Sequence, residues 1–337
     1  MKRNAFMDNA KVLFIFLVVF GHMIQPFTTD SAEMNTLYLW IYTFHMPAFI
    51  MLSGFFAKGS GDKGYIMNLA KKLLVPYLIF QFIYSAYYFL IGNSSWQAGI
   101  FYPHWSLWFL FSLFSWHLLL IGFKKIPARH GIPIAIIVGI FIGYIGDVGH
   151  TFSLSRTFVF FPFFLIGYWL TEKQLMLVKR KGVKVASIVV MLALAVSLYY
   201  APEINTGWLL ASKSYIDLGM EEYGGIARLL VYITAAAMTV SVLAWVPKRN
   251  LGWITKLGTR TLYVYLLHGF FIQYFREYQL FEVNHVMDLI GMVVLSALIV
   301  IFLSSKPVLG ISQPFIEGKA SIVKKKLFHE KERQTNI

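Results

Sequence analysis

Long apolar runs recur along the whole chain, and they constrain its fold more than any single motif does. About ten of them approach the length of roughly 20 residues that a transmembrane helix needs. The fifth, sixth and ninth are short, and the fifth and sixth suit a tilted or broken pair. The runs cover residues 12–27, 36–56, 72–92, 104–122, 132–147, 157–170, 184–201, 225–246, 261–276 and 286–304.

The composition agrees with a membrane protein. Of 337 residues, 58% are hydrophobic and only 14% are charged, whereas a soluble domain usually carries about 25% charged residues. Cysteine is absent, which excludes disulfides, thiolate metal sites and cysteine nucleophiles. We therefore expect an all-α, polytopic membrane protein with about ten transmembrane helices.

The basic residues are distributed unevenly between the loops. If the runs cross in alternation, one set of loops and the C-terminal tail hold 26 of the 30 lysines and arginines. Cytoplasmic loops carry such an excess, so we expect both termini to be cytoplasmic. The net charge of +14 then reflects topology rather than nucleic-acid binding, with anionic membrane lipid or a phosphorylated ligand as secondary partners. The other set of loops holds only Arg156, Lys213, Arg228 and Arg276.

No extramembrane domain is expected within this sequence. The longest outside loop, residues 202–224, and the tail are too short for a separate globular core. We divide the chain into a transmembrane domain at residues 1–304 and a basic cytoplasmic tail at residues 305–337. The tail segment KKKLFHEKER is expected to be mobile rather than to lie on the membrane as a basic helix.

The first run carries two ionisable residues at a spacing that matches the helical repeat. Lys11 and His22 are eleven positions apart, and eleven helical steps of about 100° return to within roughly 20° of the start while rising about 16 Å. Both side chains therefore share one helix face, with Asp8 on the same side. Two interpretations stay open: a functional pair that faces a wet interior, or a lysine that snorkels to the interface and a hydrogen-bonded packing histidine.

The second run adds three further candidates. His45 lies in its outer half, and its ring could act chemically or could satisfy backbone carbonyls that Pro47 leaves without donors. Ser53 and Gly54 lie deeper, where a close contact between helices explains them better than nucleophilic catalysis does.

Later runs contribute Arg156, Tyr265 and His268. Arg156 lies in a loop on the side that carries few basic residues, just before an aromatic run. An arginine in such a position is typical of a residue that binds an anionic group or a carboxylate. Tyr265 and His268 share one stripe of the ninth run, and a functional or a packing histidine fits that position equally well. We predict no metal site, because no helix carries paired histidines at ligand spacing, although scattered His22, His45 and His268 leave the question open.

Several motifs together resemble acyltransferase family 3 of integral membrane acyltransferases, in the stand-alone branch related to fucose 4-O-acetylase and to the membrane proteins of intercellular-adhesin operons. The family's basic residue is arginine or lysine, so Lys11 fits. Some members carry R-x-x-R before the third helix, whereas this sequence has Asn68 and the adjacent Lys71 and Lys72 there. The resemblance follows nearly the whole chain in order, through Asp8-x-x-Lys11-x10-His22, FHMPAFIMLSGFF, KKLLVPYLIF, LWFL, SRTFVFFPFFLIGY and TLYVYLLHGFF.

The resemblance implies transfer of an acyl group, usually acetyl, from cytoplasmic acetyl-CoA to a hydroxyl of an extracytoplasmic glycan or its lipid-linked precursor. It implies His22 and His45 as catalytic candidates, in the plasma membrane of a bacterium. The chemistry is compatible, because a sugar hydroxyl needs a base that is active near neutral pH and imidazole is one. The donor's phosphates suit basic side chains, and we assign donor binding to Lys11, Lys71, Lys72 and Arg156.

Two other functional classes remain open. A transporter or flippase for a polysaccharide or lipid-linked sugar would also need many helices, aromatic walls and buried histidines. An assembly subunit of a polysaccharide synthesis or export machinery is a weaker alternative. We also expect any second transfer step to need another protein, because the sequence contains no fused hydrolase-like domain of the kind that longer relatives carry.

Overall fold

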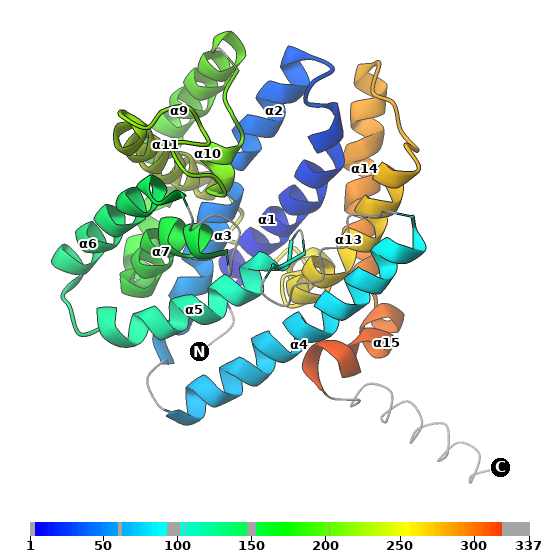
Figure 1. Cartoon of the computed structure of the whole chain (residues 1–337), viewed down its shortest axis with the longest axis horizontal. Helices are drawn as coiled ribbons and strands as arrows, with labels where there is room; N and C mark the ends of the chain where they lie inside the picture. The colour runs from blue at the N-terminus through cyan, green and yellow to red at the C-terminus, as the bar shows by residue number, and fades with distance from the viewer. Residues whose placement is uncertain are drawn as a thin grey trace.

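The computed structural model describes residues 4–59, 63–92, 102–104, 106–146, 153–201 and 203–318, and its regular elements in these ranges are all helical (Figure 1). Short helical turns join the longer helices, among them α8 (Glu172–Leu175), α10 (Gly207–Leu210), α12 (Trp253–Leu257), η1 (Gln25–Phe27) and η6 (Met176–Lys179). The longer helices are α1 (Ala5–Ile24), α2 (Ala32–Tyr42), α3 (His45–Phe56), α4 (Lys63–Leu90), α5 (Trp108–Phe123), α6 (Ala128–Phe141), α7 (Leu154–Trp169), α9 (Lys181–Tyr200), α11 (Gly224–Trp245), α13 (Thr261–Glu277), α14 (Val286–Leu303) and α15 (Lys306–Glu317).

Within the described ranges the predicted apolar runs coincide with these helices, which confirms the all-helical prediction. The run 36–56, which the sequence suggests as one span, is divided between α2 and α3. Within the described ranges, six helical segments are long and apolar enough to cross a membrane, or seven if the bent pair of α7 and the turn up to Lys179 counts as one span. Helices α5 and α6 are apolar but shorter. The count of ten crossings and the side on which the termini lie stay predictions. The six segments are Ala5–Phe27, Ala32–Gly59, Gly64–Leu90, Lys181–Tyr200, Gly224–Trp245 and Val286–Leu303.

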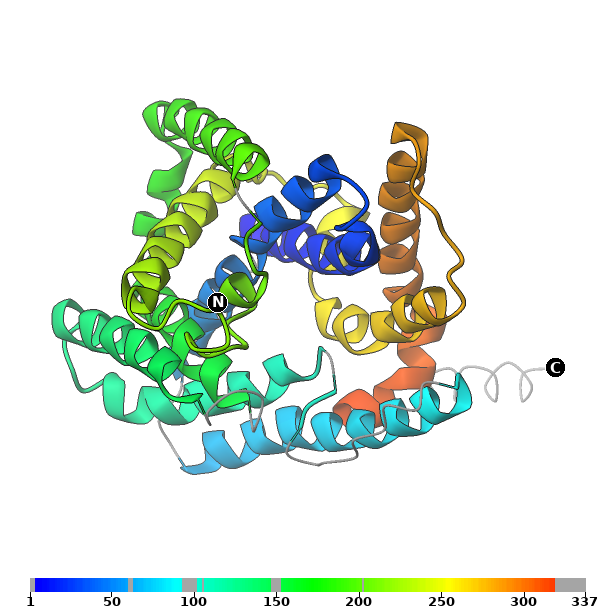
Figure 2. The ribbon, with the colours of Figure 1, turned by 45° about the horizontal axis from the view of Figure 1, so that its top comes forward.

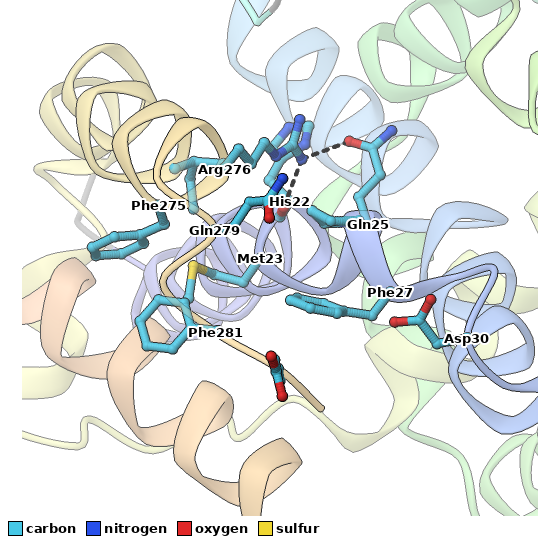
Figure 3. Close-up of a pocket in the computed structure, with 12 residues that line it drawn as sticks. His22, Met23, Gln25, Phe27, Asp30, Phe275, Arg276, Gln279 and Phe281 are labelled. Atoms are coloured by element: carbon cyan, nitrogen blue, oxygen red, sulfur yellow. Dashed lines mark hydrogen bonds between the residues drawn. The ribbon is translucent and has the colours of Figure 1, made fainter. Parts of the chain in front are cut away.

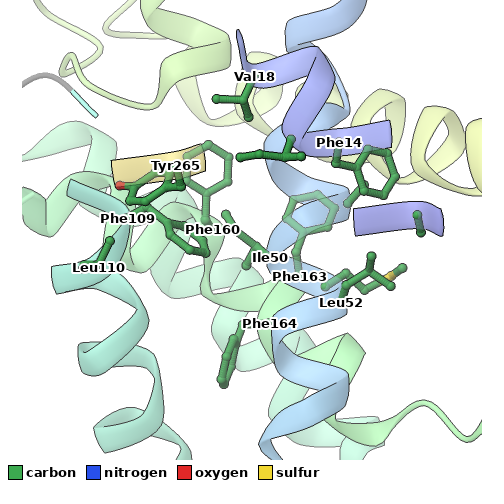
Figure 4. Packing of buried hydrophobic residues seen from close by; sticks show 14 of the residues in the cluster. Phe14, Val18, Ile50, Leu52, Phe109, Leu110, Phe160, Phe163, Phe164 and Tyr265 are labelled. Carbon is green, nitrogen blue, oxygen red and sulfur yellow. The ribbon is translucent and has the colours of Figure 1, made fainter. Parts of the chain in front are cut away.

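Helix α1 lies at the centre of the bundle. Figure 2 shows α9 and α11 on one side of it and α13 and α14 on the other, and α1 packs directly on α2, α3, α13 and α14. The core beside α1 is largely aromatic: Phe14 of α1 and Phe163 of α7 lie in one buried cluster with Phe109 and Tyr265 (Figure 4). A central helix packed on so many neighbours carries its polar residues into the protein interior rather than into lipid.

Two glycines allow α3 and α7 to cross in backbone contact. A Cβ atom on Gly54 would lie 1.9 Å from the Phe164 carbonyl oxygen, and one on Gly167 would lie 1.9 Å from the Met51 carbonyl oxygen. Only glycine permits such an approach. The Ser53 hydroxyl meanwhile donates to the Phe49 carbonyl, 2.9 Å away in its own helix. This is the small-residue contact that the sequence interpretation favours for Ser53 and Gly54.

Hydrogen bonds join the basic loops at the end of the bundle where α1 begins, which we call the Lys11 end. The Asn9 side-chain amide donates to the Pro247 carbonyl at 2.9 Å, and the Lys58 ammonium donates to the Leu170 carbonyl. Lys179 donates to carbonyls at the C-terminus of α11. Four of the segments that the sequence assigns to one side therefore lie together: the N-terminal segment, the loop with Lys58, the loop with Lys179 and the loop that follows α11. The opposite end, where α1 finishes, we call the His22 end.

The first residues of the basic tail form a packed helix. Helix α15 contacts α4, α13 and α14, and the Tyr263 hydroxyl donates to Glu317 at 2.5 Å. The segment KKKLFHEKER, which was expected to be mobile, lies outside the described residues.

Candidate functional site

Helix α1 carries Lys11 and His22 to opposite ends of the bundle. The Asn4 side chain caps the helix by accepting from the Phe6 amide at 3.0 Å, and the helix then continues without a break to Ile24. The two ionisable residues are therefore about 16 Å apart along one helix, as their spacing predicts.

His22 lines a cavity of about 660 Å³ at the C-terminal end of α1 (Figure 3). We call it the His22 cavity. Its walls come from three segments that are distant in sequence: the end of α1 with η1, the end of α13, and the loop that follows α13. The lining combines aromatic rings with carboxylates, amides and one guanidinium. Besides His22 it comprises Met23, Gln25, Pro26, Phe27, Asp30, Ile272, Phe275, Arg276, Gln279, Phe281 and Glu282.

Arg276 ties the end of α13 to the end of α1. Its Nη2 donates to the His22 carbonyl oxygen at 2.7 Å and to Gln25 Oε1 at 2.8 Å (Figure 3). Carbonyls in the last turn of a helix lack partners within the helix, so a cation is well placed there. Sequence reasoning did not select Arg276 as a site residue. Arg276 is one of only four basic residues in the loops that carry few of them, and this unusual position could have identified it.

Tyr42, at the end of α2, contacts the His22 ring. Its hydroxyl oxygen lies 3.1 Å from His22 Nδ1, and its ring packs on Tyr38 with centroids 3.9 Å apart. A Cβ on Gly21 would come within 2.9 Å of the Tyr42 ring, so the glycine beside His22 makes room for the tyrosine. Sequence reasoning missed Tyr42, since one tyrosine among 19 carries no distinguishing pattern.

His268 of α13 stacks on His22. The ring centroids are 5.6 Å apart and the planes differ by 25°. His268 Nδ1 lies 2.7 Å from the Tyr265 carbonyl and 3.1 Å from the Val264 carbonyl. A carbonyl can only accept, so Nδ1 carries the hydrogen and the lone pair of the neutral ring is on Nε2. The structure thus brings together two histidines that the sequence places 246 positions apart.

His45 lies on the other side of Tyr42 and bonds to the backbone. Its Nδ1 lies 2.9 Å from the Ile41 carbonyl, at the break between α2 and α3, and its ring meets the Tyr42 ring edge to face at 4.5 Å. The carbonyl that Pro47 leaves without a helical donor is that of Thr43, four positions earlier, so the His45 ring serves the break between α2 and α3 rather than the carbonyl freed by the proline. His45 is buried and does not line the His22 cavity.

Lys11 is held by Asp8. The ammonium lies 3.1 Å from a carboxylate oxygen of Asp8 and 4.7 Å from the centre of the Phe56 ring. Asp8 is buried, and its backbone is so close to Gly258 that a Cβ there would lie 2.3 Å from the Asp8 carbonyl oxygen. Because the Asp8 backbone is held in this close contact, the ion pair fixes the orientation of the Lys11 side chain.

The face of α1 between Lys11 and His22 is filled by packing. Ile15 and Val18, which lie on this face, are buried in the core (Figure 4 shows Val18). A donor arm that reaches from one end to the other must displace these side chains or enter by another route.

The other predicted donor-binding residues lie elsewhere. Lys71 and Lys72 are exposed on α4, a helix that packs on α5, α13 and α15. Arg156 begins α7 at the His22 end, where its Nε donates to the Leu210 carbonyl at 3.2 Å and its guanidinium stacks over Trp108 at 5.1 Å. The Tyr265 hydroxyl donates to the Ser106 carbonyl. In the part of the chain that the structure describes, no three His, Asp or Glu side chains gather as a metal site would require.

Comparison with known proteins gives a match over most of the chain. Residues 4–305 match the family model described as an acyltransferase domain. The nodulation protein NolL of Sinorhizobium fredii is 34% identical over 89 residues, which is 23% of this chain and 23% of that protein. The similarity to NolL thus spans less than a quarter of its length. No solved structure matches.

Proposed function

Because this chain belongs to acyltransferase family 3, we propose that it is a membrane O-acyltransferase that moves an acetyl group from cytoplasmic acetyl-CoA to a hydroxyl of an extracytoplasmic glycan or its lipid-linked precursor. The observation that carries the proposal is that His22 lines a cavity of about 660 Å³ at one end of α1 while Lys11 stands at the other end. One helix then connects an acceptor site and a donor site.

In the proposed reaction, His22 removes the proton from the acceptor hydroxyl as its oxygen attacks the thioester carbonyl. A carbon–oxygen bond forms, the carbon–sulfur bond breaks, and the proton ends on the departing coenzyme A thiolate. For Nε2 of His22 to be the base, Nδ1 must carry hydrogen and donate to the Tyr42 oxygen. Tyr42 is therefore proposed to fix the tautomer and the orientation of the ring.

The lining of the His22 cavity supports a hydroxyl-rich acceptor. Gln25, Gln279 and the carboxylates of Asp30 and Glu282 can hydrogen-bond sugar hydroxyls, while the aromatic ring of Phe27 offers an apolar surface. A second cavity of about 480 Å³ shares Asp30 with the first and is lined by further polar groups, among them Ser31, Glu33, Asn284 and His285. A glycan longer than one sugar could extend into it.

The distribution of basic residues supports the proposed orientation. With the Lys11 end in the cytoplasm, the ammonium of Lys11 meets coenzyme A first, and the exposed Lys71 and Lys72 are secondary contacts for its phosphates. Arg156 stands at the opposite end and holds the end of α10. We therefore propose a structural role for Arg156 rather than direct contact with the donor.

Thioester turnover by the purified protein tests the proposal. Protein in lipid nanodiscs, supplied with acetyl-CoA and a crude extract of surface glycans and their precursors, should release free coenzyme A thiol and acetylate an acceptor that mass spectrometry detects. A transporter, a flippase or an assembly subunit would release no thiol above the rate of a sample without protein.

A further inference from the structure

An apolar groove of about 460 Å³ runs between α4, α13 and α14. Its lining is entirely aliphatic and aromatic, and the hydroxyl of Tyr87 donates to the Phe270 carbonyl, 2.6 Å away. Buried Ile299 contributes to the lining, while Leu298 and Phe302 are 55% and 54% exposed at its rim. The groove is therefore open towards the surroundings of the bundle, and its lining is apolar apart from the hydroxyls of Tyr87 and Tyr274.

The groove lies along about two turns of α14, from Leu295 to Phe302, and about one turn of α13, from Phe270 to Phe275. Phe275 lies near the C-terminus of α13, at the His22 end, whereas Phe302 lies near the C-terminus of α14, at the Lys11 end. Phe271 and Phe302 meet edge to face, with ring centroids 6.0 Å apart. A ligand that follows α14, a candidate membrane span, would lie along the direction in which lipid chains run in a bilayer.

The groove adjoins the His22 cavity at a single residue. Phe275 lines both spaces, and its ring meets the ring of Phe281, a cavity residue, edge to face at 5.1 Å (Figure 3). Arg276, the next residue, contributes a guanidinium on the cavity side of this boundary. The apolar groove and the polar His22 cavity are thus neighbours across Phe275, and the positive charge of Arg276 lies close to this shared residue.

We infer that the groove seats the hydrocarbon chain of the acceptor, so that the acceptor is a saccharide linked through phosphate to a membrane lipid. The chain lies in the groove, the phosphate lies near Arg276 at the junction, and the sugar lies in the cavity beside His22. This inference rests on the proposed function. It decides between the two acceptors that the proposed function leaves open, the free glycan and its lipid-linked precursor. An ordinary bilayer phospholipid is the competing occupant of the groove.

The test measures the affinity of purified protein in detergent for a polyprenyl-phosphate-linked monosaccharide, with phosphatidylglycerol as the comparison ligand. Leu298→Trp fills the rim of the groove. Val294→Trp is the matched control, because Val294 lies one turn earlier on α14, is 52% exposed and does not line the groove. We expect Leu298→Trp to weaken binding of the lipid-linked sugar about tenfold and Val294→Trp to change it less than about twofold.

Two outcomes would overturn the inference: equal affinities in the two tryptophan variants, or an affinity for phosphatidylglycerol equal to that for the lipid-linked sugar. A measurement of acetyl transfer shows whether the groove assignment alone is wrong or whether the proposed function is wrong as well. If acetyl-CoA is consumed with a free oligosaccharide as readily as with the lipid-linked sugar, the enzyme assignment stands and the groove assignment falls. If neither acceptor supports thiol release, the proposed function falls, whatever the groove binds.

Discussion

At the scale of single residues, contacts from two helices, α2 and α13, hold His22 in place. Tyr42 of α2 meets its Nδ1, His268 of α13 stacks on its face, and Arg276 bonds to its backbone carbonyl. A histidine with a fixed orientation on the wall of a cavity is better suited to proton transfer than one that rotates freely.

Replacing His22 with glutamine tests the proposed base. Glutamine keeps much of the volume and can hydrogen-bond, but it cannot take up the proton. A positioned base typically contributes 10²–10⁴-fold to the rate, so acetyl transfer should fall by about that factor. Thermal unfolding in detergent should change little. Transfer near the wild-type rate by purified His22→Gln protein would make His22 structural and direct attention to His268.

The Tyr42 hydroxyl is expected to matter to activity more than to stability. Tyr42→Phe removes one hydrogen bond, at a cost of about 1 kcal/mol in folding, and also frees the His22 ring to turn. We expect kcat to fall about tenfold or more. The control is Tyr232→Phe, which removes a buried hydroxyl bonded to the Val159 carbonyl at 2.8 Å. An equal loss of kcat in both variants would show that Tyr42 does not position His22.

At the scale of helices, α3 and α7 cross in backbone contact at Gly54 and Gly167. We expect Gly54→Ala to destabilise the protein by about 3 kcal/mol or more, because its methyl group would collide with the Phe164 backbone. Gly291→Ala in α14 is the control: nothing lies within 4 Å of its added Cβ, and alanine favours helix by about 1 kcal/mol. Thermal unfolding of the two purified variants should shift in opposite directions.

The helices were predictable from the sequence because each is encoded locally. Apolar runs indicate where helices lie, and the helical repeat alone places Lys11 and His22 on one face. The break between α2 and α3 was not predicted, because the run 36–56 is apolar throughout. The site was less predictable, because its contacts join distant positions. Arg276 and His22 are 254 residues apart, and nothing near either residue specifies the other. The cavity follows from how the ends of α1 and α13 meet, which local patterns do not encode.

At the scale of the whole molecule, the bundle has two chemically different ends. Lys11→Ala should raise the KM for acetyl-CoA about tenfold or more, since a contact with an ionised group is worth about 1.5–3 kcal/mol. The KM for the acceptor should stay the same, because the His22 cavity lies at the other end of α1. Lys11→Arg should retain most activity. A change in acceptor KM alone would place Lys11 outside the donor site.

The orientation of the bundle is the last and most general prediction. The absence of cysteine from the sequence allows single cysteines to report on each side. Lys181 and Lys213 are both exposed, in loops that the charge distribution assigns to opposite sides. In intact cells, an impermeant thiol reagent should label Lys213→Cys and should spare Lys181→Cys until the membrane is opened. Lys179 is unsuitable because its ammonium holds the end of α11. The reverse labelling pattern would place His22 on the cytoplasmic side and would remove the basis for an extracytoplasmic acceptor.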